Sequence, residues 1–190
     1  MVARPLIPAD EIYDRALALL DVEGVDAINA RRLAAELGIS TRTLYQQVGK
    51  RDELIRMLVA RHFAALQLDF RPRPRWEDTA LEWCLVLLRD LQAHPFLTEL
   101  MSFEDRASVM HYIDALTSAS LKEGLPRRLA LDCSRVLVNV TVNHAITEAR
   151  ALHEPTRPAL EAKQQEKAFR QLVRWVVVGV RAEYLKGCEA

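Results

Sequence analysis

Arg42, Thr43 and Gln46 are spaced so that a helix over residues 41–48 presents them on its exposed side. These side chains suit the edges of DNA bases. Arginine pairs with guanine, glutamine pairs with adenine, and threonine offers a hydroxyl and a methyl group. Leu44 and Val48, four residues apart, are expected to face inward from the same helix. The pattern predicts a helix that reads bases in the major groove.

A short helix before this one would position it. Asn29 is a favoured N-cap, and Leu33 and Leu37 lie on one face of the helix that follows it. Gly38 is expected to end that helix, because glycine adopts the left-handed conformation without a steric penalty. Ser40 then caps the next helix. Two capped helices around so short a turn predict a helix-turn-helix.

Positive charge is concentrated in this region. Residues 30–51 carry five basic residues and one acidic residue, a net charge of +4, whereas the whole chain has 26 basic and 26 acidic residues. Such a local positive field attracts phosphate. Plain packing of two helices with a solvated outer face is the alternative. The residues expected to contact DNA are Arg31, Arg32, Ser40, Thr41, Arg42, Thr43, Tyr45, Gln46, Gln47, Lys50 and Arg51.

The stretch from Ile12 to about Leu58 resembles the tetracycline-repressor (TetR) family of bacterial transcription regulators. The matching strings are ALALLDVEGVDAI (16–28), RRLAAELGIS (31–40), TLY (43–45) and DEL (52–54). The resemblance implies an all-α, homodimeric regulator that binds a palindromic DNA operator, with a second domain for a small-molecule effector. A ligand-released repressor is the function it favours.

Two departures from the family's pattern fall where DNA would be touched. Gln47 stands where the family commonly has a histidine, and Arg51 stands where it usually has a lysine. Either side chain can still donate to a phosphate, glutamine through its amide and arginine through its planar guanidinium. We therefore expect the operator sequence to differ, while DNA binding itself is kept.

The remaining signals along the chain are all helical, which predicts an all-α fold of about nine helices. Prolines lie at several of the expected joins, where a missing N–H is harmless. The segment 71–75, which reads RPRPR, breaks the periodicity and marks a boundary. The predicted parts are a DNA-binding domain (1–50), a connecting helix (51–70) and a helical domain for ligand binding and dimerisation (71–190). Further helices are expected at 8–22, 51–68, 76–93, 95–101, 104–123, 126–153 and 158–186.

The expected last helix carries apolar residues almost all round, so it needs cover on more than one side. A homodimer in which the last two helices pair with their two-fold copies supplies that cover. A two-fold protein also matches the ~34 Å repeat of half-sites in a palindromic operator. The alternative is that the whole stripe is core within one chain. The stripe comprises Phe169, Leu172, Val173, Val176, Val177, Val180 and Tyr184.

Polar residues in the expected 126–153 helix predict a ligand site. Asn139, Asn143 and Thr147 share one face, and His144 and Glu148 share the neighbouring one with Thr141. Buried amides cost free energy unless paired, so they would meet a ligand, a partner chain or each other. Core packing and an ordinary surface pair of His144 with Glu148 are the alternatives. The expected ligand-binding residues are Trp83, Leu87, Met101, Phe103, Met110, His111, Asn139, Asn143, His144 and Thr147.

Other kinds of function find little support in the sequence. The chain lacks a phosphate-binding glycine loop, a nucleophile elbow and a paired metal-ligand motif, so we expect no enzyme activity, no cofactor and no metal. Its three cysteines lack metal or redox spacing and are interpreted as incidental thiols. Without an apolar run of ~18 residues or a signal peptide, a cytoplasmic protein is expected. The alternative function is a helical module that binds a protein or a small molecule without reading DNA.

Overall fold

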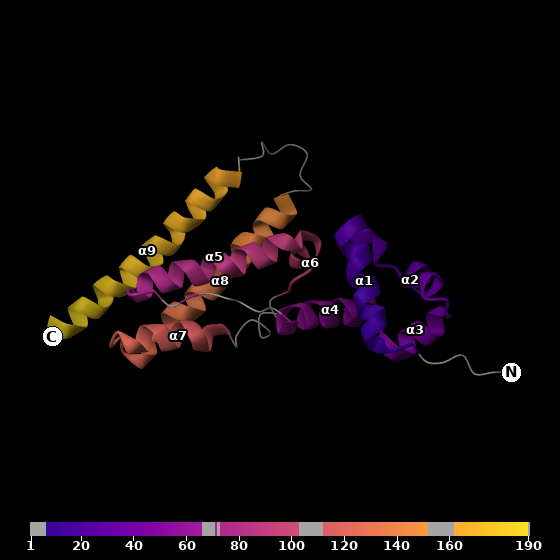
Figure 1. Cartoon of the computed structure of the whole chain (residues 1–190), viewed down its shortest axis with the longest axis horizontal. Coiled ribbons are helices and arrows are strands. Elements are labelled where there is room, and N and C mark those ends of the chain that lie inside the picture. The colour runs from indigo at the N-terminus through magenta and orange to yellow at the C-terminus, as the bar shows by residue number, and fades with distance from the viewer. Residues whose placement is uncertain (1–6, 66–70, 72, 103–111, 152–161, 190) are drawn as a thin grey trace.

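The computed structural model shows α-helices arranged in two parts (Figure 1). It describes residues 7–65, 71, 73–102, 112–151 and 162–189. Within these ranges there is no strand, so the all-α prediction is confirmed. The elements are α1 (Ala9–Glu23), the 3-10 helix η1 (Val25–Ala27), α2 (Ala30–Glu36), α3 (Thr41–Val48), α4 (Arg51–Ala65), α5 (Trp76–Ala93), α6 (Pro95–Glu99), α7 (Tyr112–Lys122), α8 (Arg127–Ala151) and α9 (Ala162–Glu189).

Most expected helix ends agree with the structure to within three residues wherever both are described. The expected helix 76–93 coincides with α5, and the expected helix 126–153 contains α8. The short helix η1 was not predicted, because a single turn leaves no periodicity in the sequence. The beginnings of the expected helices 104–123 and 158–186 lie outside the described residues.

The N-terminal part is a small bundle in which α1 lies beside the α2–α3 pair, on the side that faces α4 (Figure 1). Ile12 and Leu20 of α1 are completely buried, and they share one apolar core with Leu33 of α2 and Leu44 of α3. Burying side chains of this size contributes roughly 1.5–3 kcal/mol each. This packing fixes the angle at which α3 is presented to solvent.

The second part is built around α8, which contacts α5, α6, α7 and α9. Trp83 and Leu87 of α5 are fully buried on one side of that helix. Phe169 and Val173 of α9 are equally buried and belong to the same core. Figure 1 shows α4 extending between the two parts of the molecule. The expected connecting role of the 51–68 helix thus matches the position of α4, and the proposed domain boundaries remain predictions.

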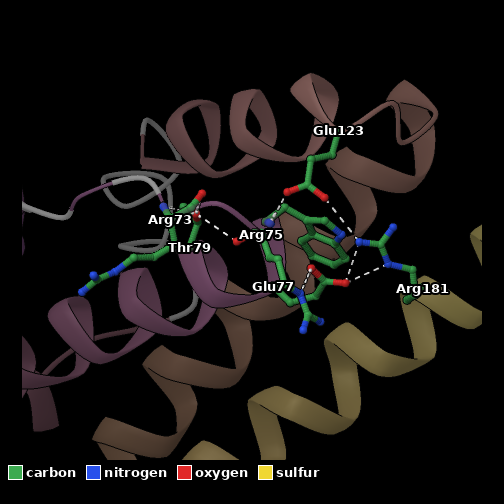
Figure 2. Close-up of polar contacts among 7 residues, drawn as sticks. Arg73, Arg75, Glu77, Thr79, Glu123 and Arg181 are labelled. Carbon is green, nitrogen blue, oxygen red and sulfur yellow. Dashed lines mark hydrogen bonds and ion pairs between the residues drawn. The ribbon is translucent and has the colours of Figure 1, made fainter.

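An arginine on α9 ties that helix to two other elements (Figure 2). Arg181 donates through Nε to Glu77 Oε1 at 2.7 Å and through a terminal N–H to Glu123 Oε2 at 3.3 Å. The other oxygen of Glu123 accepts from the backbone N–H of Trp76. Burial opposes ionisation of Glu77, but hydrogen bonds from its own backbone and from Arg181 lower the pKa of this carboxyl. The cluster therefore fixes where α9 lies against the start of α5.

Besides α4, a direct contact between α1 and α6 joins the N-terminal part to the larger part. His94, which precedes α6, places Nδ1 3.0 Å from both carboxylate oxygens of Asp21 at the end of α1. The ring of His94 also packs edge-on against His62 of α4, with 4.7 Å between centroids. Gly24 has φ +78° and lies against Phe96, since a Cβ there would come within 3.2 Å of the ring. The N-terminal part therefore meets the larger part at α1 as well as at α4.

This junction predicts a loss of stability in mild acid. Burial, reinforced by the nearby His94 and only partly opposed by Asp21, lowers the pKa of His62 from 6.5 to about 4. As the pH falls from 6.5 towards 4, His62 is therefore protonated in the unfolded chain but stays neutral in the folded chain. Between pH 7 and pH 5 the free energy of unfolding should drop by about 1–2 kcal/mol from this residue alone. Urea unfolding of the wild type and of His62→Leu at both pH values measures the difference.

The variant should show a shallower dependence on pH than the wild type, because it lacks the buried imidazole. Equal slopes for the two proteins over pH 5–7 would contradict this assignment of the acid sensitivity to His62.

Candidate functional site

The α2–α3 pair has the local geometry of a helix-turn-helix. Asn29 Oδ1 accepts from the backbone N–H of Arg32 at 2.9 Å, and Ser40 Oγ accepts from that of Thr43 at 3.0 Å. Gly38 lies between the two helices with φ +64°, a conformation that favours glycine. Both predicted caps and the predicted glycine turn are therefore confirmed. The angle between the two helices is specified by these neighbouring residues and by the shared core.

The two sides of α3 differ sharply in exposure. Leu44 and Val48 are buried, with only 1% and 5% of their surface exposed, whereas Tyr45 is 47% exposed. Arg42 and Gln46 are exposed beside Tyr45, and within the described residues neither side chain makes a hydrogen bond or an ion pair. An arginine and an amide one helical turn apart, free of internal partners, are suited to bind base edges.

The remaining expected residues on this side divide into exposed and partly covered ones. Arg31 and Lys50 are exposed at either end of the helix pair. Thr41 and Thr43 are half-buried, and the Thr43 hydroxyl shares a 2.8 Å hydrogen bond with Ser40, the N-cap of α3. Ser40 and Thr43 thus serve the start of the helix, where a hydroxyl and a backbone N–H can also face a phosphate.

Three residues expected to contact DNA have their donors engaged inside the protein instead. Arg32 pairs with Glu23 and Glu36, and its hydrogen bond holds the pKa of Glu23 below its usual value. Gln47 donates to the carbonyl of Ile7 at 2.7 Å. These contacts join α2 to α1 and the start of the described chain to α3. Arg32 and Gln47 therefore have positioning contacts within the protein, and their expected contacts with phosphate remain predictions.

Arg51 is the third of these residues. Its Nε donates to the carbonyl of Ile28 at 3.1 Å, and a terminal N–H lies 3.4 Å from the carbonyl of Val25. The side chain thereby ties the first turn of α4 to the carbonyl of the first residue of η1 and to that of the residue that follows η1. Arg51 therefore attaches α4 to the preceding turn, and its expected contact with phosphate remains a prediction.

A capping residue that the sequence did not reveal lies at the start of α4. Glu53 accepts from the backbone N–H of Lys50 at 2.6 Å, which is one half of a capping box. Its side chain passes directly over Gly49, where an added Cβ would lie 2.2 Å from Glu53 Oε2. Gly49 also has φ +73°. The turn between α3 and α4 therefore requires glycine for two separate reasons.

Gly49→Ala should consequently lower the free energy of unfolding by about 2 kcal/mol, the sum of left-handed strain and a weakened cap. Gly38→Ala should cost about 1 kcal/mol, since φ is also positive there but a Cβ would meet nothing within 4 Å. Urea denaturation of both variants measures the difference. Gly187→Ala in α9 is the control, because a Cβ there meets no atom within 4 Å either. Equal losses for Gly49→Ala and Gly38→Ala would contradict the role of Glu53.

The expected ligand-binding residues that the structure describes have two kinds of environment. Trp83, Leu87 and Met101 are buried in the core of the larger part. Asn139, Asn143 and Thr147 lie instead on the exposed side of α8. This polar stripe is exposed in the single chain, because the apolar residues of α8 that face the core lie on its other side, and its contact with a ligand or a partner chain remains a prediction. Phe103, Met110 and His111 lie outside the described residues.

His144 has a different environment from the other polar residues of α8. Its Nε2 lies 3.2 Å from Glu148 Oε1, and its ring packs on Phe169 of α9 with 4.8 Å between centroids. Glu148 also accepts from the amide of Gln92 on α5 at 2.8 Å. Burial opposes ionisation of Glu148, but the hydrogen bonds from His144 and Gln92 lower its pKa. The pair of His144 with Glu148, the alternative to a ligand contact, is thus part of a half-buried network that joins α5, α8 and α9, and ligand binding by His144 remains a prediction.

The apolar stripe of α9 is mostly core within the chain. Phe169, Val173 and Val177 are buried against the other helices, as the alternative interpretation had it. The exposed apolar side chains of this helix are Trp175 and Val178, at 66% and 65%, followed by Leu185. On α8, Val136 is exposed on the same side as Asn139 and Asn143. The last two helices therefore retain exposed sides that differ from the stripe predicted to form the dimer.

Cys84 and Cys133 lie in the core, where burial raises the pKa of each thiol to about 12. This agrees with their interpretation as incidental thiols. In the described ranges, no helix combines the length and apolarity needed to cross a membrane. Nor do three or more histidine, cysteine or acidic side chains meet there in a group that could hold a metal ion.

The capped helix pair and the exposed side of α3 place the protein in the class of helix-turn-helix proteins. No protein-family profile matches the chain. A sequence relative from Saccharopolyspora erythraea, described as an HTH-type transcriptional regulator, is 26% identical over 162 residues. The match covers 83% of this chain and 69% of the relative.

Two solved structures share the fold along almost the whole chain. The TetR-family protein ActR of Streptomyces coelicolor, in complex with (S)-DNPA, has a TM-score of 0.71 and 23% identity, and the match covers 95% of this chain and 100% of ActR. BioQ, solved with its natural double-stranded DNA operator, has a TM-score of 0.72 and 18% identity, and the match covers 93% and 99% of the two chains. The protein therefore has the fold of TetR-type regulators.

Proposed function

We propose that this protein is a DNA-binding transcription regulator, a repressor that binds a palindromic operator as a homodimer. The observation that carries the proposal is the exposed side of α3. Leu44 and Val48 anchor the helix in the core, while Arg42 and Gln46 face solvent without internal partners in the described part of the chain. Sequence-specific readers combine such a rigid helix with free base-binding side chains.

A homodimer is proposed through the exposed sides of α8 and α9. Trp175 and Val178 present large apolar surfaces to solvent on the long last helix. Pairing these helices with their two-fold copies would bury that surface in a four-helix arrangement. Asn139 and Asn143 would then lie at the same interface on α8, where their amides could bond across the two-fold axis. Two copies of α3 would be presented to successive major grooves.

We further propose that a small molecule bound in the larger part weakens DNA binding. Two routes connect that part to the reading helices: α4, and the contact of α6 with α1 through His94, Asp21 and Phe96. A ligand that shifts α6 would change the separation of the two α3 helices in a dimer. By linkage, operator DNA must then weaken ligand binding by the same factor.

The salt dependence of binding to duplex DNA tests the proposal. Neutralising phosphates releases counterions, so the affinity should fall steeply with salt, with a log–log slope near −0.9 for each phosphate contacted. The measurement uses the full chain with a random-sequence duplex at several salt concentrations. A flat response, or no binding at low salt, would favour a helical module that binds a small molecule or a protein without reading DNA.

A further inference from the structure

A hollow of about 760 Å³ lies between α5 and the beginning of α9, on the side of α5 opposite Trp83. Its volume falls within the range of sites that enclose drug-sized ligands, roughly 300–1,000 Å³. It runs along α5 from Asp78 to Gln92, which are fourteen residues apart and so about 21 Å apart along the helix axis. The hollow is elongated and open to solvent along one side.

The floor of the hollow is apolar. Leu81, Leu85 and Leu88 recur at helical spacing along α5 and line it. Leu88 is buried, but Leu81 and Leu85 are only half-covered by the protein. The opposite side of α5 carries Trp83 and Leu87 into the core. The helix is therefore apolar on two sides, and only one of them is fully covered within the described chain.

The two ends of the hollow carry different polar groups. Arg73 at one end is paired with Glu82. At the other end Arg170 is paired with Glu166. Arg89 is the exception among the arginines that line the hollow, because its only hydrogen bond in the described residues goes to the carbonyl of Leu85 on its own helix. Arg89 therefore stands at the end formed by the last turns of α5 without an ion pair in the described residues. Burial raises the pKa of the neighbouring Asp90 carboxyl, and the charge of Arg89 partly offsets this. Asp78 lines the opposite end of the hollow.

Gln92 is a second polar group beside Arg89 at this end of the hollow. Its amide N–H donates to Glu148, which is in turn held by His144 behind the wall of the hollow. Because Gln92 is fixed in this way, its amide oxygen and remaining N–H are held beside the hollow. A headgroup arriving at Arg89 would thus meet a fixed amide and a guanidinium, which together can bind a carboxylate.

We infer that the hollow between α5 and α9 binds an elongated amphiphile with a carboxylate headgroup. The carboxylate pairs with Arg89 beside Gln92, and the apolar body lies over Leu81, Leu85 and Leu88. Burial of that body drives binding, and the arginine selects an anion over a cation of equal length. The hollow would be the effector site of the proposed regulator. Binding of the amphiphile does not depend on that proposed function, but its effect on DNA affinity does.

Calorimetric titration of the full chain with decanoate, in the absence of DNA, tests the site. Decyltrimethylammonium serves as the matched cationic probe. Arg89→Gln should weaken decanoate binding about tenfold, since a hydrogen bond to a charged group is lost. Leu85→Trp should block binding, because the indole would lie across the middle of the apolar floor on which the alkyl chain packs. The controls are Arg128→Gln on α8 and Leu121→Trp on α7, both at exposed positions away from the hollow. Thermal melts check that each variant is folded.

Saturable binding of decanoate that both hollow variants lose and both controls keep would support the inference. No saturable binding by the wild type, equal affinity for the cationic probe, or binding unchanged in either folded hollow variant would overturn it. The proposed regulatory function is judged separately, by whether the wild type binds duplex DNA without any amphiphile present.

Discussion

Trp175→Arg should convert the dimer to a monomer and weaken operator binding by at least about 100-fold. The indole is 66% exposed in the single chain, so its replacement leaves the fold of that chain intact. In a two-fold dimer each substitution occurs twice, and two unpaired guanidinium groups would be buried at one interface. Loss of the second half-site contact removes the gain from bivalent binding, which spans roughly 10²–10⁴. Analytical ultracentrifugation and operator titration measure the two effects.

Val178→Arg should act in the same way, since Val178 is 65% exposed on the same helix. Leu121→Arg is the matched control, because Leu121 is an exposed apolar residue on α7, outside the proposed interface. A wild-type chain that sediments as a monomer, or a Trp175→Arg variant that remains a dimer, would contradict this placement of the interface.

Arg42→Ala should cost about 1–3 kcal/mol of binding to the selected operator and relax the base preference at one position in each half-site. The guanidinium is free of partners in the described part of the chain and lies one turn from Gln46 on the exposed side of α3. Its removal leaves the caps and the core of the helix pair untouched. Selection of binding sequences from a random duplex pool, followed by titration on operator and random DNA, measures both effects.

Arg128→Ala is the control for the loss of one positive charge, since this arginine is 96% exposed on α8, far from α3 in the sequence. It should leave operator affinity and base preference unchanged. If Arg42→Ala instead weakened operator and random DNA by the same factor, Arg42 would be a backbone contact and would not read a base.

The helix-turn-helix was predictable because its determinants are local. Asn29 and Ser40 accept from residues three positions ahead, and Gly38 needs only its own conformation. The roles of Gln47 and Arg51 were not predictable, because their partners are 40 and 23 residues away in the sequence at Ile7 and Ile28. A polar side chain near a reading helix can face DNA or the protein, and only the packed structure distinguishes the two.

The ligand site shows the corresponding limit for apolar helices. Trp83 and Leu87 identify one side of α5, while Leu81 and Leu85 identify another, and helical periodicity fits both. The sequence prediction places the ligand beside Trp83, which is buried, and the hollow proposed as the ligand site lies on the side of Leu81 and Leu85. Which side stays open depends on how α9 crosses α5, and that crossing is fixed by Arg181 with Glu77 and Glu123, more than 50 residues distant from it in the sequence.

The spacing of half-sites tests the central claim most directly. A rigid dimer that presents two α3 helices to one side of the duplex requires half-site centres about one helical turn, ~34 Å, or a whole number of turns apart. Titration should compare the selected operator with the same operator carrying about half a turn of extra DNA, ~5 base pairs, between its half-sites. We expect the insertion to weaken binding about 100-fold, to the level of a single half-site. Unchanged affinity would contradict a two-fold protein that reads DNA with α3.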